Sequence, residues 1–309
     1  MKRIIHIAFL CVAFAALTFT AKAAEPVVKT GIEVLRDRGF EILKGKRVGL
    51  VTNPSGVDRF LNSTVDILFN APDVELVALY GPEHGVRGDV YAGGHVTDTK
   101  DDATGLPVYS IYGATRKPTP QMLEGIDVMV YDIQDVGVRS YTFISTLGLV
   151  MEACGEKGIE VVVLDRPNPL GGNKIEGCFV EPGFFSFVSQ YEIPYVYGLT
   201  VGELAVMINE EGMNRGQKGN QAPARCDLTV VPMEGWTRDM LYEDTGLPWV
   251  LPSPNIPFKD TPMYYAAAGI CGELYGFMNI GIGYTLPFQV FGATWLDPDL
   301  LKARLDSYG

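Results

Sequence analysis

A carboxyl group and an imidazole lie next to each other in the segment Gly81-Pro82-Glu83-His84-Gly85. The proline restricts the backbone here, and the two glycines tolerate tight turns. Glu83 follows a run of apolar residues, and a carboxyl group beside apolar side chains can serve as a general acid. His84 could bind a substrate or orient a carboxylate. We therefore take Glu83 as the first candidate for a catalytic acid. The alternative is an incidental Glu-His pair in a surface turn.

Polar residues also follow three other apolar runs. The candidates among them for catalysis or substrate binding are Asn53, Asp132, Gln134, Asp135, Arg139, Tyr141, Asp165, Arg166 and Asn168. In an open parallel sheet, ligands bind beyond the carboxyl ends of the strands. We therefore expect these side chains to share one site with Glu83 and His84. The alternative at any single position is that an Asp or Asn only caps the following helix.

Two of these carboxyl groups, Asp132 and Asp165, are candidates for a second catalytic group. Glycoside hydrolysis usually needs two carboxyl groups, one on each side of the scissile bond. Arg139 and Arg166 lie close to them in sequence and offer planar guanidinium groups that could bind sugar hydroxyls or a carboxylate. The alternative is that each Arg only balances the charge of a neighbouring Asp.

The elements that must position these residues form an alternating pattern. Short, nearly continuous apolar runs predict buried strands at residues 47–53, 74–80, 106–111, 127–131 and 159–164. Apolar residues at helical spacing predict helices at 64–69 and 141–157. Apolar strands that alternate with helices are typical of a parallel sheet covered on both faces. We therefore expect a Rossmann-like α/β domain over residues 24–185.

The pattern changes after residue 185. A helix is predicted at 200–211, where Thr200 and Glu203 fit a capping box, and a strand at 227–232. Proline- and glycine-rich stretches follow, and then a helix at 298–305. We expect residues 186–309 to form a smaller α+β domain, with the site in the cleft between the two domains.

The N-terminus predicts export. Met1-Lys2-Arg3 precedes an apolar run over residues 4–20, and Ala21-Lys22-Ala23 has the pattern that signal peptidase cleaves. The apolar run is shorter than the roughly 20 residues that span a bilayer. We therefore expect residues 1–23 to be a cleaved signal peptide, no transmembrane helix after cleavage, and a periplasmic or secreted protein. A retained anchor is the alternative.

Composition excludes several classes of function. The formal net charge of −12 argues against nucleic acid and anionic membranes as partners. The few histidines and the absence of a C-x-x-C pattern predict no metal site. The four cysteines beyond the signal peptide could be paired or free. No Gly-x-Gly-x-x-Gly fingerprint, phosphate loop or nucleophile elbow is present, so no cofactor is expected.

Five motifs resemble one bacterial family, the exo-β-N-acetylmuramidases of glycoside hydrolase family 171, formerly a family of unknown function. In order they are Gly81-Pro82-Glu83-His84-Gly85 and the segments at 104–110, 131–137, 164–169 and 252–257. The resemblance implies an enzyme that removes N-acetylmuramic acid from the non-reducing ends of peptidoglycan glycans. It implies that Glu83 is the catalytic carboxyl group and that Asn255 reaches the cleft from the second domain.

The sequence departs from the family pattern at two places. Val196-Tyr197 stand where an Arg-His pair is common, and the glycine-rich segment at 281–286 lacks an Arg. The precise sugar is therefore open. The family is also usually longer at the C-terminus, so the chain could be a truncated form. Alternatives are a non-catalytic glycan-binding protein, a muropeptide deacetylase or amidase, and a dinucleotide-dependent enzyme. The oligomeric state is not predicted.

Overall fold

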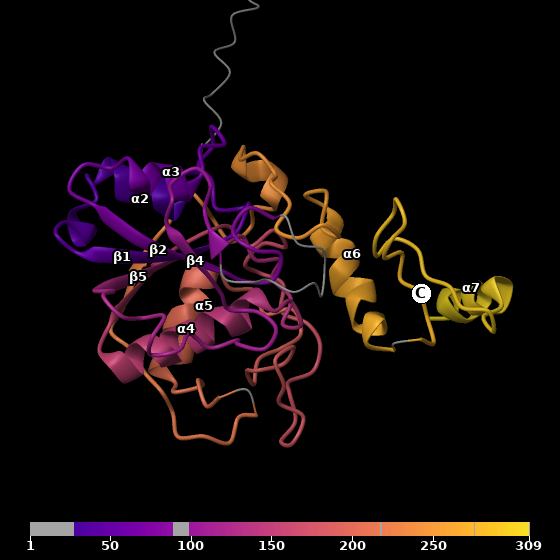
Figure 1. Ribbon diagram of the computed structural model, residues 1–309. Helices are drawn as coiled ribbons and strands as arrows, with labels where there is room; N and C mark the ends of the chain where they lie inside the picture. Colours follow the sequence, from indigo (N-terminus) through magenta and orange to yellow (C-terminus); the bar gives the residue numbers. More distant parts are fainter. Residues whose placement is uncertain (1–27, 89–98, 217, 275, 309) are drawn as a thin grey trace, which may run out of the picture.

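The computed structural model describes residues 28–88, 99–216, 218–274 and 276–308. Within these residues, seven strands form one sheet in the order β3-β4-β2-β1-β5-β6-β7 (Figure 1). The strands are β1 (Arg47–Thr52), β2 (Glu75–Gly81), β3 (Thr99–Lys100), β4 (Pro107–Ser110), β5 (Val128–Asp132), β6 (Glu160–Leu164) and β7 (Leu228–Val231). All pairings are parallel except that of β3 with β4. The expected parallel α/β sheet is confirmed.

Helices cover both faces of this sheet. The two helices α2 (Gly31–Asp37) and α3 (Thr64–Phe69) lie on one side, and α4 (Phe143–Lys157) and α5 (Val201–Glu210) lie on the other (Figure 1). Short 3-10 turns are η1 (Glu41–Leu43), η2 (Tyr242–Thr245) and η3 (Gly269–Glu273). The helix predicted at 200–211 is confirmed, with the capping box of Thr200 and Glu203 at its start.

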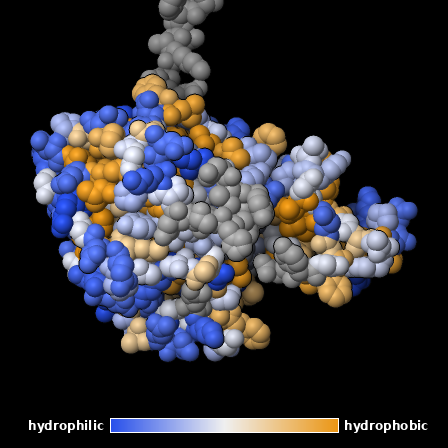
Figure 2. All heavy atoms as spheres, viewed as in Figure 1, coloured by the Kyte–Doolittle hydropathy of each residue, from blue (hydrophilic) through white to orange (hydrophobic). Residues whose placement is uncertain are grey.

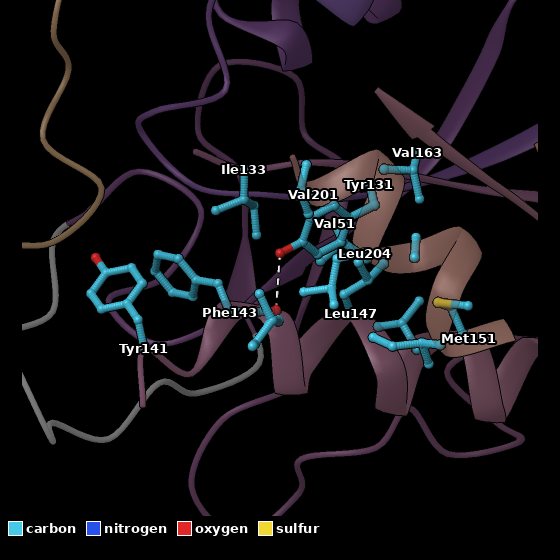
Figure 3. Packing of buried hydrophobic residues seen from close by; sticks show 14 of the residues in the cluster. Val51, Tyr131, Ile133, Tyr141, Phe143, Leu147, Met151, Val163, Val201 and Leu204 are labelled. Atoms are coloured by element: carbon cyan, nitrogen blue, oxygen red, sulfur yellow. Dashed lines mark hydrogen bonds between the residues drawn. The ribbon is translucent and has the colours of Figure 1, made fainter. Parts of the chain in front are cut away.

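Neighbouring residues of one strand pack into opposite cores. In β1, Leu50 joins the cluster beneath α2 and α3, whereas Val51 joins the cluster beneath α4 and α5. In β5, Val130 and Tyr131 divide in the same way. This alternation follows from the two-residue period of a strand, and it explains why strands buried on both faces read as continuous apolar runs. The Tyr131 hydroxyl also donates a 3.0 Å hydrogen bond to the Phe143 carbonyl, which fixes the first turn of α4 over the sheet (Figure 3).

The sheet continues beyond residue 185, where the sequence analysis placed a domain boundary. Strand β7 pairs in parallel with β6, and α5 packs against both strands and α4. A capped helix followed by an apolar strand repeats the pattern of the first 185 residues, and that repetition was the signal for a longer α/β unit. The division of the chain into two domains, with a cleft between them, stays a prediction.

The last described residues extend to one side of the sheet (Figure 1). They contain α6 (Thr261–Ala268) and α7 (Pro298–Asp306), and α7 confirms the helix predicted at 298–305. Ala268, Ile280 and Phe288 are buried in the α4–α5 core. Other large apolar side chains of this part are exposed at the surface (Figure 2).

Two expectations about the whole chain concern cysteines and membranes. The sequence left open whether the cysteines are paired or free. The structure shows four free thiols, those of Cys154, Cys178, Cys226 and Cys271. Among the described residues, no helix combines the length and hydropathy needed to cross a bilayer. The predicted signal peptide at residues 1–23 lies outside the described residues.

Candidate active site

Glu83 lines a pocket at the carboxyl end of β2. The pocket has a volume of about 150 Å³. Its lining residues are Glu83, His84, Ser140, Tyr141, Thr142, Phe143, Ser253, Asn255, Ile256, Tyr265 and Phe288. They come from the turn after β2, the start of α4, the loop before α6, α6 itself and the C-terminal part. Four of the residues predicted from the sequence, Glu83, His84, Tyr141 and Asn255, therefore meet in one place.

Hydroxyl groups hold both oxygens of the Glu83 carboxyl group. The Tyr112 hydroxyl donates to Oε1 at 2.9 Å, and the Thr142 hydroxyl donates to Oε2 at 3.2 Å. Thr142 occupies the N-cap position of α4, yet its side chain makes no capping hydrogen bond to the helix. A threonine at this position usually caps the helix backbone. Here its hydroxyl faces the carboxyl group instead.

The turn that carries Glu83 has an unusual backbone. His84 and Gly85 follow it with φ angles of +75° and +76°, in the left-handed region that non-glycine residues rarely adopt. Gly81 fits closely against this turn, because a Cβ there would lie 3.2 Å from the Cα of Gly85, which is a tight contact. Strained backbone of this kind is concentrated at functional sites. The buried His84 and the half-buried Glu83 are therefore held in a fixed turn at the pocket.

Aromatic rings form another wall of the pocket. Tyr141 packs edge-on against Phe143 and Tyr265, with ring centroids 5.0 and 5.6 Å apart, and Tyr265 packs edge-on against Phe288 at 4.9 Å. The rings of Tyr141 and Phe143 lie side by side at the start of α4 (Figure 3). The Ser140 hydroxyl bonds to that of Tyr265 at 3.0 Å, which ties α6 to this wall. A pocket with one acidic wall and one aromatic wall suits a sugar ring, which has polar edges and apolar faces.

Asp132 lies at the end of β5 but in a different environment. Its carboxylate is fully buried and pairs with the buried Arg166 guanidinium, with Nε–Oδ1 and Nη2–Oδ2 distances of 2.5 and 2.9 Å. Thr64 donates a further short hydrogen bond to Asp132, and Arg166 donates to the Val57 carbonyl. Within the described residues, neither side chain lines the Glu83 pocket. The pair joins the ends of β5 and β6 to the start of α3.

Asp165 follows β6 and holds the start of α5. Its carboxylate accepts hydrogen bonds from the Thr200 hydroxyl at 2.9 Å and from the Gly202 amide at 2.8 Å. Burial disfavours the charged form and raises the pKa of Asp165 from 3.8 to about 6. The residue is not part of the Glu83 pocket as the described residues define it. These contacts with the start of α5 correspond to the alternative given in the sequence analysis, in which an Asp after a strand holds the following helix. A catalytic role of Asp165 stays a prediction.

The raised pKa of Asp165 predicts a pH-dependent stability. The folded state binds this proton more tightly than the unfolded state, so the contribution is present below about pH 4 and is lost as pH rises through about 6. Asp165→Asn removes the titration and keeps the side-chain shape. We expect the unfolding free energy of the wild type, relative to the variant, to fall by about 2 kcal/mol between about pH 4 and about pH 7. Urea unfolding at several pH values measures this, and parallel curves for the two proteins would contradict it.

Four other predicted residues make hydrogen bonds inside the scaffold. Asn53 bonds to the Pro252 carbonyl and to Ser55. Gln134 donates to the Pro167 carbonyl, Asn168 donates to the Leu199 carbonyl, and Arg139 donates to the carbonyls of Cys178 and Ile193. These buried bonds tie together the loops around the carboxyl ends of the strands. A role for these residues in substrate binding stays a prediction.

Asp135 is buried beside Tyr197. The Tyr197 hydroxyl donates a short hydrogen bond to Asp135 Oδ2, which also accepts from the Gly137 amide at 2.8 Å. Burial raises the pKa of Asp135 from 3.8 to about 6. Tyr197 is one of the positions where the sequence departs from the family pattern, and its phenol donates to this carboxyl group.

Several residues in the pocket or beside it were not predicted from the sequence. Tyr112 and Thr142 hold the carboxyl group, and Ser253, Tyr265 and Phe288 line the pocket. A signal existed for Ser253, which lies within the proline-bracketed motif at 252–257. None existed for Tyr265, because it lies on a mostly apolar helix. No group of His, Cys, Asp or Glu side chains in the described part of the chain could hold a metal ion.

Known proteins resemble the chain over most of its length. The family model described as exo-β-N-acetylmuramidase NamZ, N-terminal, matches residues 48–260. The peptidoglycan β-N-acetylmuramidase NamZ of Bacillus subtilis (strain 168) is 48% identical over 285 residues, which are 92% of this chain and 66% of that protein. The chain thus spans slightly less than two thirds of the length of this curated relative.

Two solved structures from Bacteroides fragilis NCTC 9343, both of DUF1343 family proteins, share the fold. The first is 56% identical with a TM-score of 0.83, and the match covers 92% of this chain and 70% of that one. The second is 34% identical with a TM-score of 0.72, covering 86% and 67%. The match of the family model to more than half of the chain settles its membership. The chain belongs to the family described as exo-β-N-acetylmuramidase NamZ, N-terminal.

Proposed function

We propose that the protein is an exo-acting glycoside hydrolase that releases N-acetylmuramic acid from the non-reducing ends of peptidoglycan fragments. Glu83 is the general acid in this proposal. The observation that carries it is a carboxyl group held by two hydroxyl groups at the edge of a pocket with an aromatic wall. Membership of the NamZ family supports the choice of bond and sugar.

The chemistry requires Glu83 to give its proton to the leaving oxygen as the glycosidic bond breaks. The electron pair of that bond stays on the leaving oxygen, so the second product departs as a neutral alcohol. Glu83 becomes a carboxylate and then takes a proton from the water that completes hydrolysis.

A second group must stabilise or attack the anomeric carbon. The sequence candidates Asp132 and Asp165 are engaged in buried contacts elsewhere, and among the described residues Glu83 provides the only carboxyl group that lines the pocket. We therefore favour the acetamido group of the substrate as the internal nucleophile, a known exception to the two-carboxylate scheme. Its oxygen forms a bond to the anomeric carbon as the glycosidic bond breaks, and water then opens the resulting ring.

We also propose that residues 1–23 direct export, so that the reaction takes place in the periplasm or outside the cell. The basic N-terminus and small-x-small cleavage pattern support it.

The proposal is tested with purified protein that lacks residues 1–23 and three substrates. These are nitrophenyl β-N-acetylmuramide, nitrophenyl β-N-acetylglucosaminide and a disaccharide that ends in N-acetylmuramic acid. We expect turnover of both muramic acid substrates and at least about tenfold lower kcat/KM on the glucosaminide. Turnover of the glucosaminide alone would assign a different terminal sugar. Binding of the disaccharide without any release would indicate a non-catalytic glycan-binding protein.

A further inference from the structure

Tyr112 contacts Glu83 but does not line the pocket. It lies just after β4, and among the described residues it is absent from the pocket lining, whereas Thr142 is part of that lining. The two oxygens of the carboxyl group therefore differ in their surroundings. Oε1 accepts from Tyr112, which is outside the pocket lining, and Oε2 accepts from Thr142, which is part of it.

The position of the Tyr112 ring is supported on several sides. The Ser110 hydroxyl donates to the Tyr112 carbonyl at 3.1 Å, and this bond fixes the backbone after β4. The ring lies against that of Phe187 with centroids 6.4 Å apart, and the Arg116 guanidinium covers Phe187 at 4.3 Å. A half-buried phenol held in this way can keep its hydroxyl aimed at one oxygen.

We propose that Tyr112 is a positioning residue that makes Oε2 the proton-donating oxygen of Glu83, an inference that rests on the proposed function. The Tyr112 hydroxyl donates to Oε1, whereas Oε2 lies beside Thr142 of the pocket lining. Oε2 therefore carries the acidic proton toward the substrate, and its remaining lone pair accepts from Thr142. As that proton moves to the leaving oxygen and the glycosidic bond breaks, negative charge develops on the carboxyl group. The hydrogen bond from Tyr112 strengthens with this charge, so it stabilises the transition state more than the ground state.

Tyr112→Phe tests this because it removes one oxygen atom and keeps the ring against Phe187. We expect kcat on the muramic acid disaccharide to fall by about tenfold to a hundredfold, the effect of losing one hydrogen bond to a charged group. KM is expected to change by less than about threefold, since the bond strengthens in the transition state. The melting temperature is expected to stay within about 2 °C of the wild type.

The pH profile separates this role from a structural one. A hydroxyl that donates to a carboxylate stabilises its ionised form, so its removal favours the protonated form. A general acid works only while protonated. The limb of the kcat/KM profile on which activity is lost as pH rises is therefore expected to move to higher pH, by about one unit in Tyr112→Phe.

The matched control is Tyr308→Phe, which removes the same atom from a side chain that is 74% exposed and outside the pocket. It should keep the kinetics and the pH profile of the wild type. Glu83→Gln, measured in parallel, separates a failure of the positioning role of Tyr112 from a failure of the proposed function. If Glu83→Gln is inactive and Tyr112→Phe has wild-type kcat, or a lower kcat with an unmoved limb, the positioning role is overturned alone. If Glu83→Gln is fully active, or the wild type turns over none of the substrates, the proposed function and this inference are both overturned.

Discussion

Replacement of Glu83 by glutamine is expected to lower kcat/KM on a muramic acid disaccharide by about a hundredfold or more. The amide keeps the size of the side chain. Its oxygen can accept from one of the two hydroxyl groups of Tyr112 and Thr142, and its NH2 group can donate to the other. What it lacks is an acidic proton for the leaving oxygen. The loss is therefore expected in kcat, while the melting temperature and the affinity for the product sugar stay close to those of the wild type.

The matched control for this change is Glu124→Gln, which alters an exposed carboxyl group before β5. It is expected to have no effect on either kinetic constant. Steady-state release of the sugar, measured by chromatography, gives both values. Equal rates for Glu83→Gln and the wild type would remove Glu83 from the mechanism, even if the protein proves to be a muramidase.

The second large effect is expected on stability. Arg166→Met leaves the fully buried carboxylate of Asp132 without its cationic partner. Loss of one partner of a buried pair is costly because the remaining charge is neither solvated nor balanced. We expect the free energy of unfolding in urea to fall by about 3–5 kcal/mol.

The exposed pair Lys302–Asp306 gives the comparison. Lys302→Met is expected to change the free energy of unfolding by less than about 0.5 kcal/mol, since exposed pairs are solvated in both states. If Arg166→Met were as stable as the wild type but inactive, the assignment of the Asp132–Arg166 pair to the scaffold would be wrong, and a direct role of Asp132 in catalysis would be favoured.

The sheet could be predicted from sequence because each strand carries its own signal. In a strand such as β1, Leu50 and Val51 point to opposite faces and both are buried, so the run of apolar residues is itself the evidence for a covered parallel strand. The place of β7 at the edge of the same sheet had a weaker signal. A four-residue strand that follows a long polar loop does not reveal which strand it pairs with.

The candidate site could be predicted only in part, for a physical reason. An Asp after a strand looks the same in sequence whether it faces a substrate or caps a helix. Asp165 accepts from the Gly202 amide, and Glu83 faces a pocket, yet both follow apolar strands. What separated Glu83 was the turn around it, where glycines allow a backbone that exposes the side chain. Contacts across long sequence separations, such as that of Tyr265 with Tyr141, carry no local signal.

Proton donation by Glu83 to the leaving oxygen can be tested by varying the leaving group. Wild type and Glu83→Gln are compared on the muramic acid disaccharide and on dinitrophenyl β-N-acetylmuramide, whose leaving group departs without protonation. We expect the variant to lose about a hundredfold or more in kcat/KM on the disaccharide and less than about tenfold on the dinitrophenyl substrate. An equal loss on both substrates would contradict it, because Glu83 would then act on something other than the leaving oxygen.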